Sequence, residues 1–282
     1  MIAEGPLIVF TLAAQLACGL VLVTVFCDLR ARGSEEGGAR RLGLFVFPVA
    51  VLAMAASLFH LGRPFAAWRA LLNWRTSPLS AEVLFFGLFL GAALLDSYLW
   101  GARKMRGRLA VGAVAAFLGL GVVISSALIY LIPGREPWNS VWVPLSFLGS
   151  TFVLGGAAAT SSGAAGNDLF LRKAFSAAGA AGGLAVIVSA ALMAVRFSSH
   201  VPNALAAAQL VAARHLILSR AAGGFAVYVA LAGILPVAFA LWRWRTSRPV
   251  VPIERAVFWA VLAGAAVGRV LMFAVGTRIP QF

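Results

Sequence analysis

Residues 57–85 read Ser-Leu-Phe-His-Leu-Gly-Arg-Pro-Phe-Ala-Ala-Trp-Arg-Ala-Leu-Leu-Asn-Trp-Arg-Thr-Ser-Pro-Leu-Ser-Ala-Glu-Val-Leu-Phe, and they join two long apolar segments. The first segment ends in His60, and the next begins near Glu82 after a short connection that carries three Arg and two Trp. The pattern predicts two neighbouring membrane-spanning helices, with an imidazole and a carboxyl group at the ends that face the same connection.

The composition of the sequence is that of an integral membrane protein. Hydrophobic residues make up 62% of its 282 residues and charged residues only 11%, a balance that soluble domains of this length do not have. The net charge of +14 does not indicate nucleic-acid binding, because the basic residues sit in short connections rather than on a continuous basic face. The positive-inside rule, by which Lys and Arg gather in the cytoplasmic loops of membrane proteins, explains the positive net charge better.

Eight apolar runs are long enough to cross a hydrocarbon core, which takes about 20 residues. Helices are expected in all of them, because backbone groups in lipid must be satisfied within each span. The sequence therefore predicts an all-α integral membrane protein, a bundle of eight transmembrane helices in a single membrane domain over residues 1–282. Gly and Ala crowd the fourth to sixth spans, which are expected to pack inside the bundle. The spans are predicted at approximately 6–28, 42–61, 80–101, 109–132, 141–163, 172–195, 221–242 and 254–275.

The distribution of basic residues predicts which way the bundle faces. The connections after the first, third, fifth and seventh spans contain fourteen Lys and Arg, whereas the opposite side contains eight. Both termini are therefore expected on the outer, periplasmic side of a bacterial cytoplasmic (inner) membrane. The outer connections are rich in Trp and Pro, and residues 203–219 carry apolar residues along one helical face. These features fit an aromatic belt with an interfacial helix, and they fit equally a docking platform for an extrinsic subunit.

Glu82 is the first candidate for chemistry. Ser80 is a good N-cap, so Glu82 is expected in the first turn of the third span, where an acid is also favoured simply because it complements the helix dipole. An ionisable group at the mouth of a membrane helix is nevertheless a functional candidate, and His60 ends the adjoining span. A carboxylate can accept a proton as a quinol is oxidised, and an imidazole can hydrogen-bond a quinone oxygen and titrate near neutral pH.

Three further residues near this pair are candidate quinone ligands. Arg63 follows His60 by three residues and can hold the Glu82 carboxylate ionised or steady an anionic quinone species, although an arginine at a helix end often only reaches toward the lipid headgroups. Trp68 can stack on a quinone ring, although anchoring at the headgroups is the more common role. The predicted quinone-binding set is His60, Glu82, Arg63, Trp68 and Ser80, with Glu82 and His60 as the catalytic pair.

Other polar residues in the apolar runs leave several alternatives open. A haem needs two axial ligands, usually His on facing helices, but neither His200 nor His215 lies deep in a span, so no haem and no metal site are expected. Arg269, deep in the last span, must face the bundle and find a partner, which is a carboxylate, a carbonyl or a quinone. Gln15, in the middle of the first span, either bonds another helix or lines a polar cavity.

A series of short motifs resembles the membrane-anchor subunit of the bacterial dimethyl sulfoxide reductase family. The strongest match is His60-Leu61-Gly62-x-Pro64 followed by Ser77-x-Leu79-Ser80-x-Glu82. It is preceded by Pro6-Leu7-Ile8-Val9-Phe10-Thr11 with Gln15 following, and it is succeeded by Trp142-x-Pro144 with Phe147 and by Gly268-Arg269. The resemblance runs along most of the sequence, and it depends on the order and spacing of the motifs rather than on any one of them.

The resemblance implies a role that composition cannot show. Anchors of this family bind menaquinol near the outer face and pass its electrons to an iron–sulfur subunit, which feeds a molybdopterin-containing catalytic subunit; the anchor holds no redox metal of its own. The His of the His-Leu-Gly-x-Pro motif and the Glu after the Leu-Ser pair are tied to quinol oxidation, and they correspond to His60 and Glu82. Arg63 stands where the family varies. More distant polysulfide- and nitrite-reductase membrane subunits share the general plan.

The expected function is that of the membrane anchor and quinol-binding subunit of a respiratory molybdopterin oxidoreductase. Quinol is expected between the outer ends of the second and third spans, under the connection formed by residues 62–79. Three alternatives stay open: the same site working in reverse as a quinone reductase for a dehydrogenase complex, a purely structural anchor, and a small-solute transporter. Against the transporter, the sequence shows neither an inverted repeat nor a pair of broken mid-membrane helices.

Overall fold

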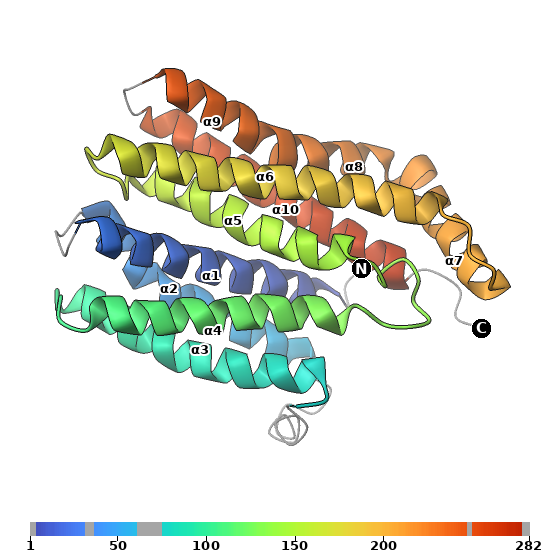
Figure 1. Ribbon diagram of the computed structural model, residues 1–282, viewed down its shortest axis with the longest axis horizontal. Coiled ribbons are helices and arrows are strands. Elements are labelled where there is room, and N and C mark those ends of the chain that lie inside the picture. Colours follow the sequence, from blue (N-terminus) through green and yellow to red (C-terminus); the bar gives the residue numbers. More distant parts are fainter. Residues whose placement is uncertain (1–3, 32–36, 61–74, 247–249, 278–282) are drawn as a thin grey trace.

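The computed structural model describes residues 4–31, 37–60, 75–246 and 250–277, and all regular structure in these ranges is helical (Figure 1). Eight helices in the described ranges are long and apolar enough to cross a membrane, which confirms the predicted all-α, eight-span fold. Seven are single elements, and the seventh in sequence order is composite. The spans are α1 (Gly5–Ala31), α2 (Gly37–His60), α3 (Pro78–Gly101), α4 (Arg108–Ile129), α5 (Trp142–Ser162), α6 (Leu169–Ser198), the composite of α8 (Ala222–Tyr228), η3 (Val229–Ile234) and α9 (Leu235–Arg245), and α10 (Val251–Thr277).

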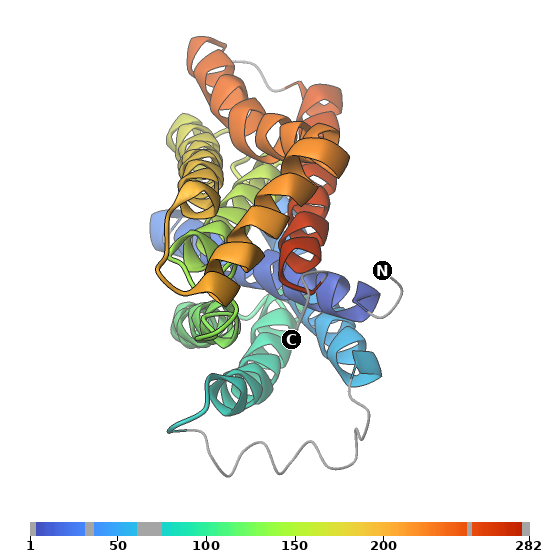
Figure 2. The ribbon, with the colours of Figure 1, turned by 90° about the vertical axis from the view of Figure 1, so that its right-hand side faces the viewer.

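The spans run side by side along the long axis of the molecule, with α1 at the centre (Figures 1 and 2). α1 packs on α2 and α4 on one side and on α5 on the other, while α3 and α9 lie toward the two flanks. The short helix α7 (Ala204–His215) lies at one end of the bundle. This end, called the α7 end below, also holds the first turns of α1, α3 and α5 and the last turns of α2, α4 and α6.

The helix predicted over residues 203–219 is confirmed as α7 and the π-helical turn η2 (Leu216–Arg220) that continues it. Asn203 is the N-cap, because its side-chain oxygen accepts hydrogen bonds from the backbone N–H groups of Leu205 and Ala206. A side chain of this kind satisfies donors that a helix start otherwise leaves free. The Gln209 side chain then ties α7 to the connection between α4 and α5 through the Gly134 carbonyl, at 3.1 Å.

Close contacts between glycines hold the centre of the bundle together. A methyl group at Gly19 of α1 would lie 2.7 Å from the Thr151 carbonyl oxygen and 2.9 Å from the Gly155 Cα of α5, so these two backbones touch. The fourth to sixth spans were expected inside the bundle. The expectation is confirmed for α5, whose most apolar 18-residue stretch is 78% buried, holds for half of that stretch in α4 (50%), and is wrong for α6 (39%). Gly179 and Gly182 of α6 face α5, and Gly183 faces the Gly233 carbonyl of η3 and the Pro236 side chain of α9. α6 thus packs on α5 with one side and on η3 and α9 with another, and side chains such as Leu184, Val188 and Val195 stay exposed.

The composite seventh span contains a wide π turn at its centre. η3 ends just before Leu235 and Pro236 begin α9. Pro236 has no N–H to donate back along the helix, and its ring crowds the preceding turn. A π turn accommodates such a residue without breaking the span.

Candidate functional site

Glu82 lies in the second turn of α3 rather than in the first. α3 begins at Pro78 and is capped by Ser77, whose side chain accepts a 3.4 Å hydrogen bond from the Ser80 N–H. The prediction that Ser80 caps this helix is therefore wrong, and the reason is Pro78, which is well suited to the first helical position because its missing N–H has no helical partner there. Glu82 stands beyond the N–H groups that a helix start leaves free. Complementing the helix dipole does not by itself account for an acid at this position.

The carboxyl group of Glu82 is buried against α4. Only 8% of the residue is exposed, and the Ser126 hydroxyl donates a hydrogen bond to its Oε1 atom. The neighbouring Ser125 hydroxyl instead donates to the carbonyls of its own helix, at 2.6 and 3.1 Å. Ser126 is thus a candidate site residue that the sequence analysis missed. The pair of serines in an otherwise apolar span could have indicated it. A buried carboxyl group with a hydroxyl partner is suited to receiving or releasing a proton.

The other predicted site residues fall partly outside the described ranges. His60 is the last residue of α2 and lies at the same end of the bundle as the start of α3, as predicted; its side chain is outside the described part. Arg63 and Trp68 lie outside the described residues. Ser80 is buried in the first turn of α3. The pairing of His60 with Glu82 stays a prediction, whereas the contact of Glu82 with Ser126 is a feature of the structure.

Tyr130 follows α4 directly and is buried. Its ring packs against three aromatic rings, those of Trp138, Phe147 and Phe273, at centroid separations of 5.2, 5.8 and 5.6 Å. Burial raises the pKa of the Tyr130 hydroxyl, the charge of Glu82 raises it further, and the charge of Arg269 lowers it. The hydroxyl is therefore within electrostatic reach of both groups. The rings around it come from the α4–α5 connection, from α5 and from α10.

Arg269 and Gln15 meet in the bundle core. Arg269 is 3% exposed, and its Nη2 atom donates a 3.1 Å hydrogen bond to the side-chain carbonyl of Gln15. Its guanidinium group also lies 3.8 Å from the centroid of the Phe147 ring, and its Nη1 atom contacts the Met272 sulfur at 3.1 Å. Of the partners predicted for Arg269, a carbonyl is the one found, and the interhelical bond predicted for Gln15 is confirmed. The Nε atom of Arg269 and the amide nitrogen of Gln15 are buried without a hydrogen-bond partner among the described residues.

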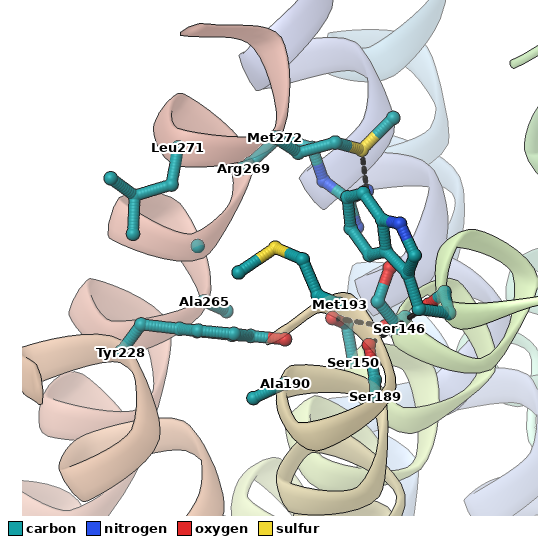
Figure 3. Close-up of a pocket in the computed structure, with 12 residues that line it drawn as sticks. Ser146, Ser150, Ser189, Ala190, Met193, Tyr228, Ala265, Arg269, Leu271 and Met272 are labelled. Carbon is teal, nitrogen blue, oxygen red and sulfur yellow. Dashed lines mark hydrogen bonds between the residues drawn. The ribbon is translucent and has the colours of Figure 1, made fainter. Parts of the chain in front are cut away.

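A narrow cavity lies beside Arg269 (Figure 3). Its walls carry Ser146 and Ser150 from α5, Ser189 from α6 and Tyr228 from α8, and the Tyr228 hydroxyl points toward the serines. The cavity volume is about 10 Å³, roughly enough for one water molecule. It does not admit a quinone ring.

The fold and these buried groups define a multi-pass helical membrane protein with a carboxyl group enclosed at the mouth of α3 and a guanidinium group enclosed in the core of the bundle. Residues 1–275 match the family model of the DMSO reductase anchor subunit (DmsC). The protein belongs to this family and is an anchor subunit of a DMSO reductase-type molybdoenzyme complex. Its place in anaerobic respiration and electron transport accords with the family name.

Individual relatives agree with the family assignment. The sequence is 27% identical over 280 residues to a chain of the anaerobic dimethyl sulfoxide reductase of Escherichia coli (strain K12), a match that spans 94% of this protein and 92% of the relative. It is 29% identical over 161 residues to the chain of the same name from Haemophilus influenzae, spanning 54% and 56% of the two proteins. It is also 29% identical over 113 residues to a subunit of the sulfite dehydrogenase of Allochromatium vinosum, spanning 35% and 34%. The resemblance predicted from the motifs is confirmed.

Proposed function

We propose that this protein is the quinol-oxidising membrane anchor of its complex, and that Glu82 accepts a proton from the bound quinol. The observation that carries the proposal is the burial of Glu82 at the mouth of α3, beyond the first turn, with the Ser126 hydroxyl as its partner. A carboxyl group enclosed in this way has no structural duty in capping its helix. An ionisable group buried in a membrane span is expensive and is retained for function.

Each residue of the proposed site has its own role in quinol oxidation. Quinol oxidation releases two electrons and two protons, and Glu82 takes one proton at its carboxyl group. Ser126 orients that carboxyl group through its hydroxyl. His60, at the end of α2, hydrogen-bonds the other quinol oxygen and relays the second proton. Arg63, Trp68 and Ser80 complete the binding site.

The other subunits of the complex receive the electrons. We propose menaquinol as the donor, an iron–sulfur subunit as the acceptor, and a molybdopterin-containing catalytic subunit as the end of the electron-transfer path. The bundle lies in the bacterial cytoplasmic membrane as one domain, with both termini on the periplasmic side, as the fourteen-to-eight distribution of basic residues supports. The α7 end then faces the periplasm, and protons released there do not cross the membrane.

The reverse direction is the second candidate. One relative is named as part of a dehydrogenase, and a dehydrogenase delivers electrons to a quinone rather than taking them from a quinol. The same carboxyl and imidazole groups would then donate protons. Net quinone reduction by the purified complex, driven by the substrate of its catalytic partner, would favour this direction.

The proposal is tested by anaerobic purification of the complex through a tag on this protein in a mild detergent. We expect one iron–sulfur protein and one molybdopterin protein by mass spectrometry, and a quinone in the organic extract. The purified complex should also oxidise added menaquinol. Purification without partners and without quinone would contradict the proposal, and haem bands in the optical spectrum would require His60, His200 or His215 as iron ligands.

A further inference from the structure

A polar cavity lies at the end of the bundle opposite the α7 end, far from the groups of the proposed quinol site. Its volume is about 230 Å³. It opens among the end of α5, the connection from α5 to α6, and the adjoining ends of α9 and α10. The side chains that matter for its chemistry are Thr160, Asn167, Arg172, Phe175, Arg243 and Glu254.

The charges around this cavity are predominantly positive. Arg243 and Glu254 have side chains that are each 4% exposed and lie 3.5 Å apart, and Arg172 also lies within electrostatic reach of Glu254. Arg172 is held at the cavity by its Nε atom, which donates a 2.9 Å hydrogen bond to the Gly166 carbonyl, and by its Nη2 atom, which donates to the same oxygen. Two guanidinium groups thus share one carboxylate. Guanidinium groups attract phosphate oxygens through charge-assisted hydrogen bonds.

An apolar groove lies on the other side of Phe175, nearer the middle of the bundle. The groove lies between α1, α5 and α6 and has a volume of about 280 Å³. Its walls include Leu22, Phe26, Phe152, Ala174, Phe175 and Ala178. Phe175 lines both the groove and the polar cavity. The two spaces together place an anion-binding head next to a hydrocarbon slot, at the depth where a membrane helix meets its connecting loops.

We propose that this cavity and groove bind one anionic phospholipid, with the phosphate at Arg172 and Arg243 and an acyl chain along the groove past Phe175. A basic pocket between membrane helices at the headgroup level is the arrangement that such lipids recognise. The apolar groove favours a lipid over a free anion, because inorganic phosphate leaves the groove empty. The lipid would join the α5–α6 connection to the ends of α9 and α10.

The test is native mass spectrometry of the detergent-purified complex. Samples are taken before delipidation and after re-addition of cardiolipin, phosphatidylglycerol or phosphatidylcholine in mixed micelles. We expect about one anionic lipid to be retained per anchor, no comparable retention of phosphatidylcholine, and at least a tenfold loss of retention in Arg172→Gln/Arg243→Gln. Lys173→Gln is the matched control, because it removes an exposed charge from the same turn of α6. Equal retention by the double variant and by the wild type would overturn the proposal.

The double variant can fail to assemble, because Arg243→Gln leaves the Glu254 carboxylate buried without Arg243. A second variant keeps the test valid in that case. Ala178→Phe fills the groove and changes no charge, and Ala181→Phe, at an exposed position of α6, is its control. The site is supported if Ala178→Phe loses the lipid and Ala181→Phe retains it. Inorganic phosphate provides the last arm: if it raises the melting temperature of the delipidated complex as much as cardiolipin does, the ligand is a free anion and the lipid assignment is wrong.

Discussion

Gln15 and Arg269, which are 254 positions apart in the sequence, are joined by a 3.1 Å hydrogen bond between the first and last spans. The guanidinium group also lies over the Phe147 ring of α5, so one cation connects three helices. Among the described residues this cation is held by an amide carbonyl, a thioether and an aromatic face rather than by an acid. A cation so enclosed fixes the relative position of α1, α5 and α10.

Gln15→Ala leaves the guanidinium group without its amide partner. We expect a loss of about 1–2 kcal/mol in the free energy of unfolding of the purified protein in micelles. Gln15→Ala/Arg269→Met should lose less than the sum of the two single variants, because it leaves no buried charge behind. Ser146→Ala, whose hydroxyl donates only to its own helix at 2.7 Å, is the control and should change stability by less than about 0.5 kcal/mol. Strictly additive losses would argue against the coupling.

The pair of Arg108 and Asp28 should contribute far more to stability than an exposed ion pair. Arg108 Nε and Nη2 reach the Asp28 carboxylate at 2.9 and 2.5 Å, and the guanidinium group stacks 3.7 Å above the Trp100 ring. Asp28→Asn removes one charge of a buried pair, and we expect it to cost about 3–5 kcal/mol. Arg30→Gln breaks a 3.2 Å pair in which the Arg30 side chain is 52% exposed, and the expected cost is about 0–1 kcal/mol. Thermal unfolding of both variants side by side tests the difference, and equal shifts would refute it.

Two Gly→Ala substitutions should differ in their effect on the stability of the bundle. Gly19→Ala forces a methyl group against the α5 backbone at 2.7 Å, so we expect α1 and α5 to separate at a cost of about 1–3 kcal/mol. Gly91→Ala meets no atom within 4 Å, and it should be neutral or stabilising by up to about 1 kcal/mol, because alanine favours the helix. The melting temperature of the assembled complex reports both. A similar loss in the two variants would mean that the glycine contact is not what holds these helices together.

Ser126 and Ser125 should separate in their effects on quinol oxidation. Ser126→Ala removes the hydroxyl that orients Glu82, and we expect the rate of quinol oxidation to fall about tenfold, or about 1.4 kcal/mol. Ser125→Ala removes a hydroxyl bonded to its own helix and should leave the rate unchanged. Steady-state kinetics with a menaquinol analogue measure both variants in the same complex. If the two serines behave alike, Ser126 does not act through Glu82.

The sequence was sufficient for the fold because the length and apolarity of a run determine whether it can span a membrane. It was not sufficient for the burial of α6. Lipid-facing and core-facing side chains are equally apolar, so hydropathy does not distinguish them. The start of α3 was misplaced because Pro78 and Ser77 compete with Ser80 for the start of the helix, and the residue type alone does not decide between them.

The candidate site was predicted in part. Glu82 and His60 were predicted from their places at the ends of apolar runs and from the family motifs, and their roles stay predictions. Ser126 and the contact between Gln15 and Arg269 depend on which helices are neighbours and how each is rotated, and a single sequence does not contain that information. Polar residues isolated in apolar spans nevertheless marked these positions, because such residues need partners inside the bundle.

The most direct test of the central claim is the anaerobic oxidation of a menaquinol analogue by the assembled complex carrying Glu82→Gln. The variant keeps the size of the side chain and removes its ability to accept a proton, so we predict a fall in rate of at least about 100-fold. Electron delivery from reduced benzyl viologen to the catalytic partner should be unchanged, which shows that the complex is assembled. Asp96→Asn, a buried acid near the other end of the same helix, should retain quinol oxidation. A Glu82→Gln complex that oxidises the quinol at the wild-type rate would contradict the account.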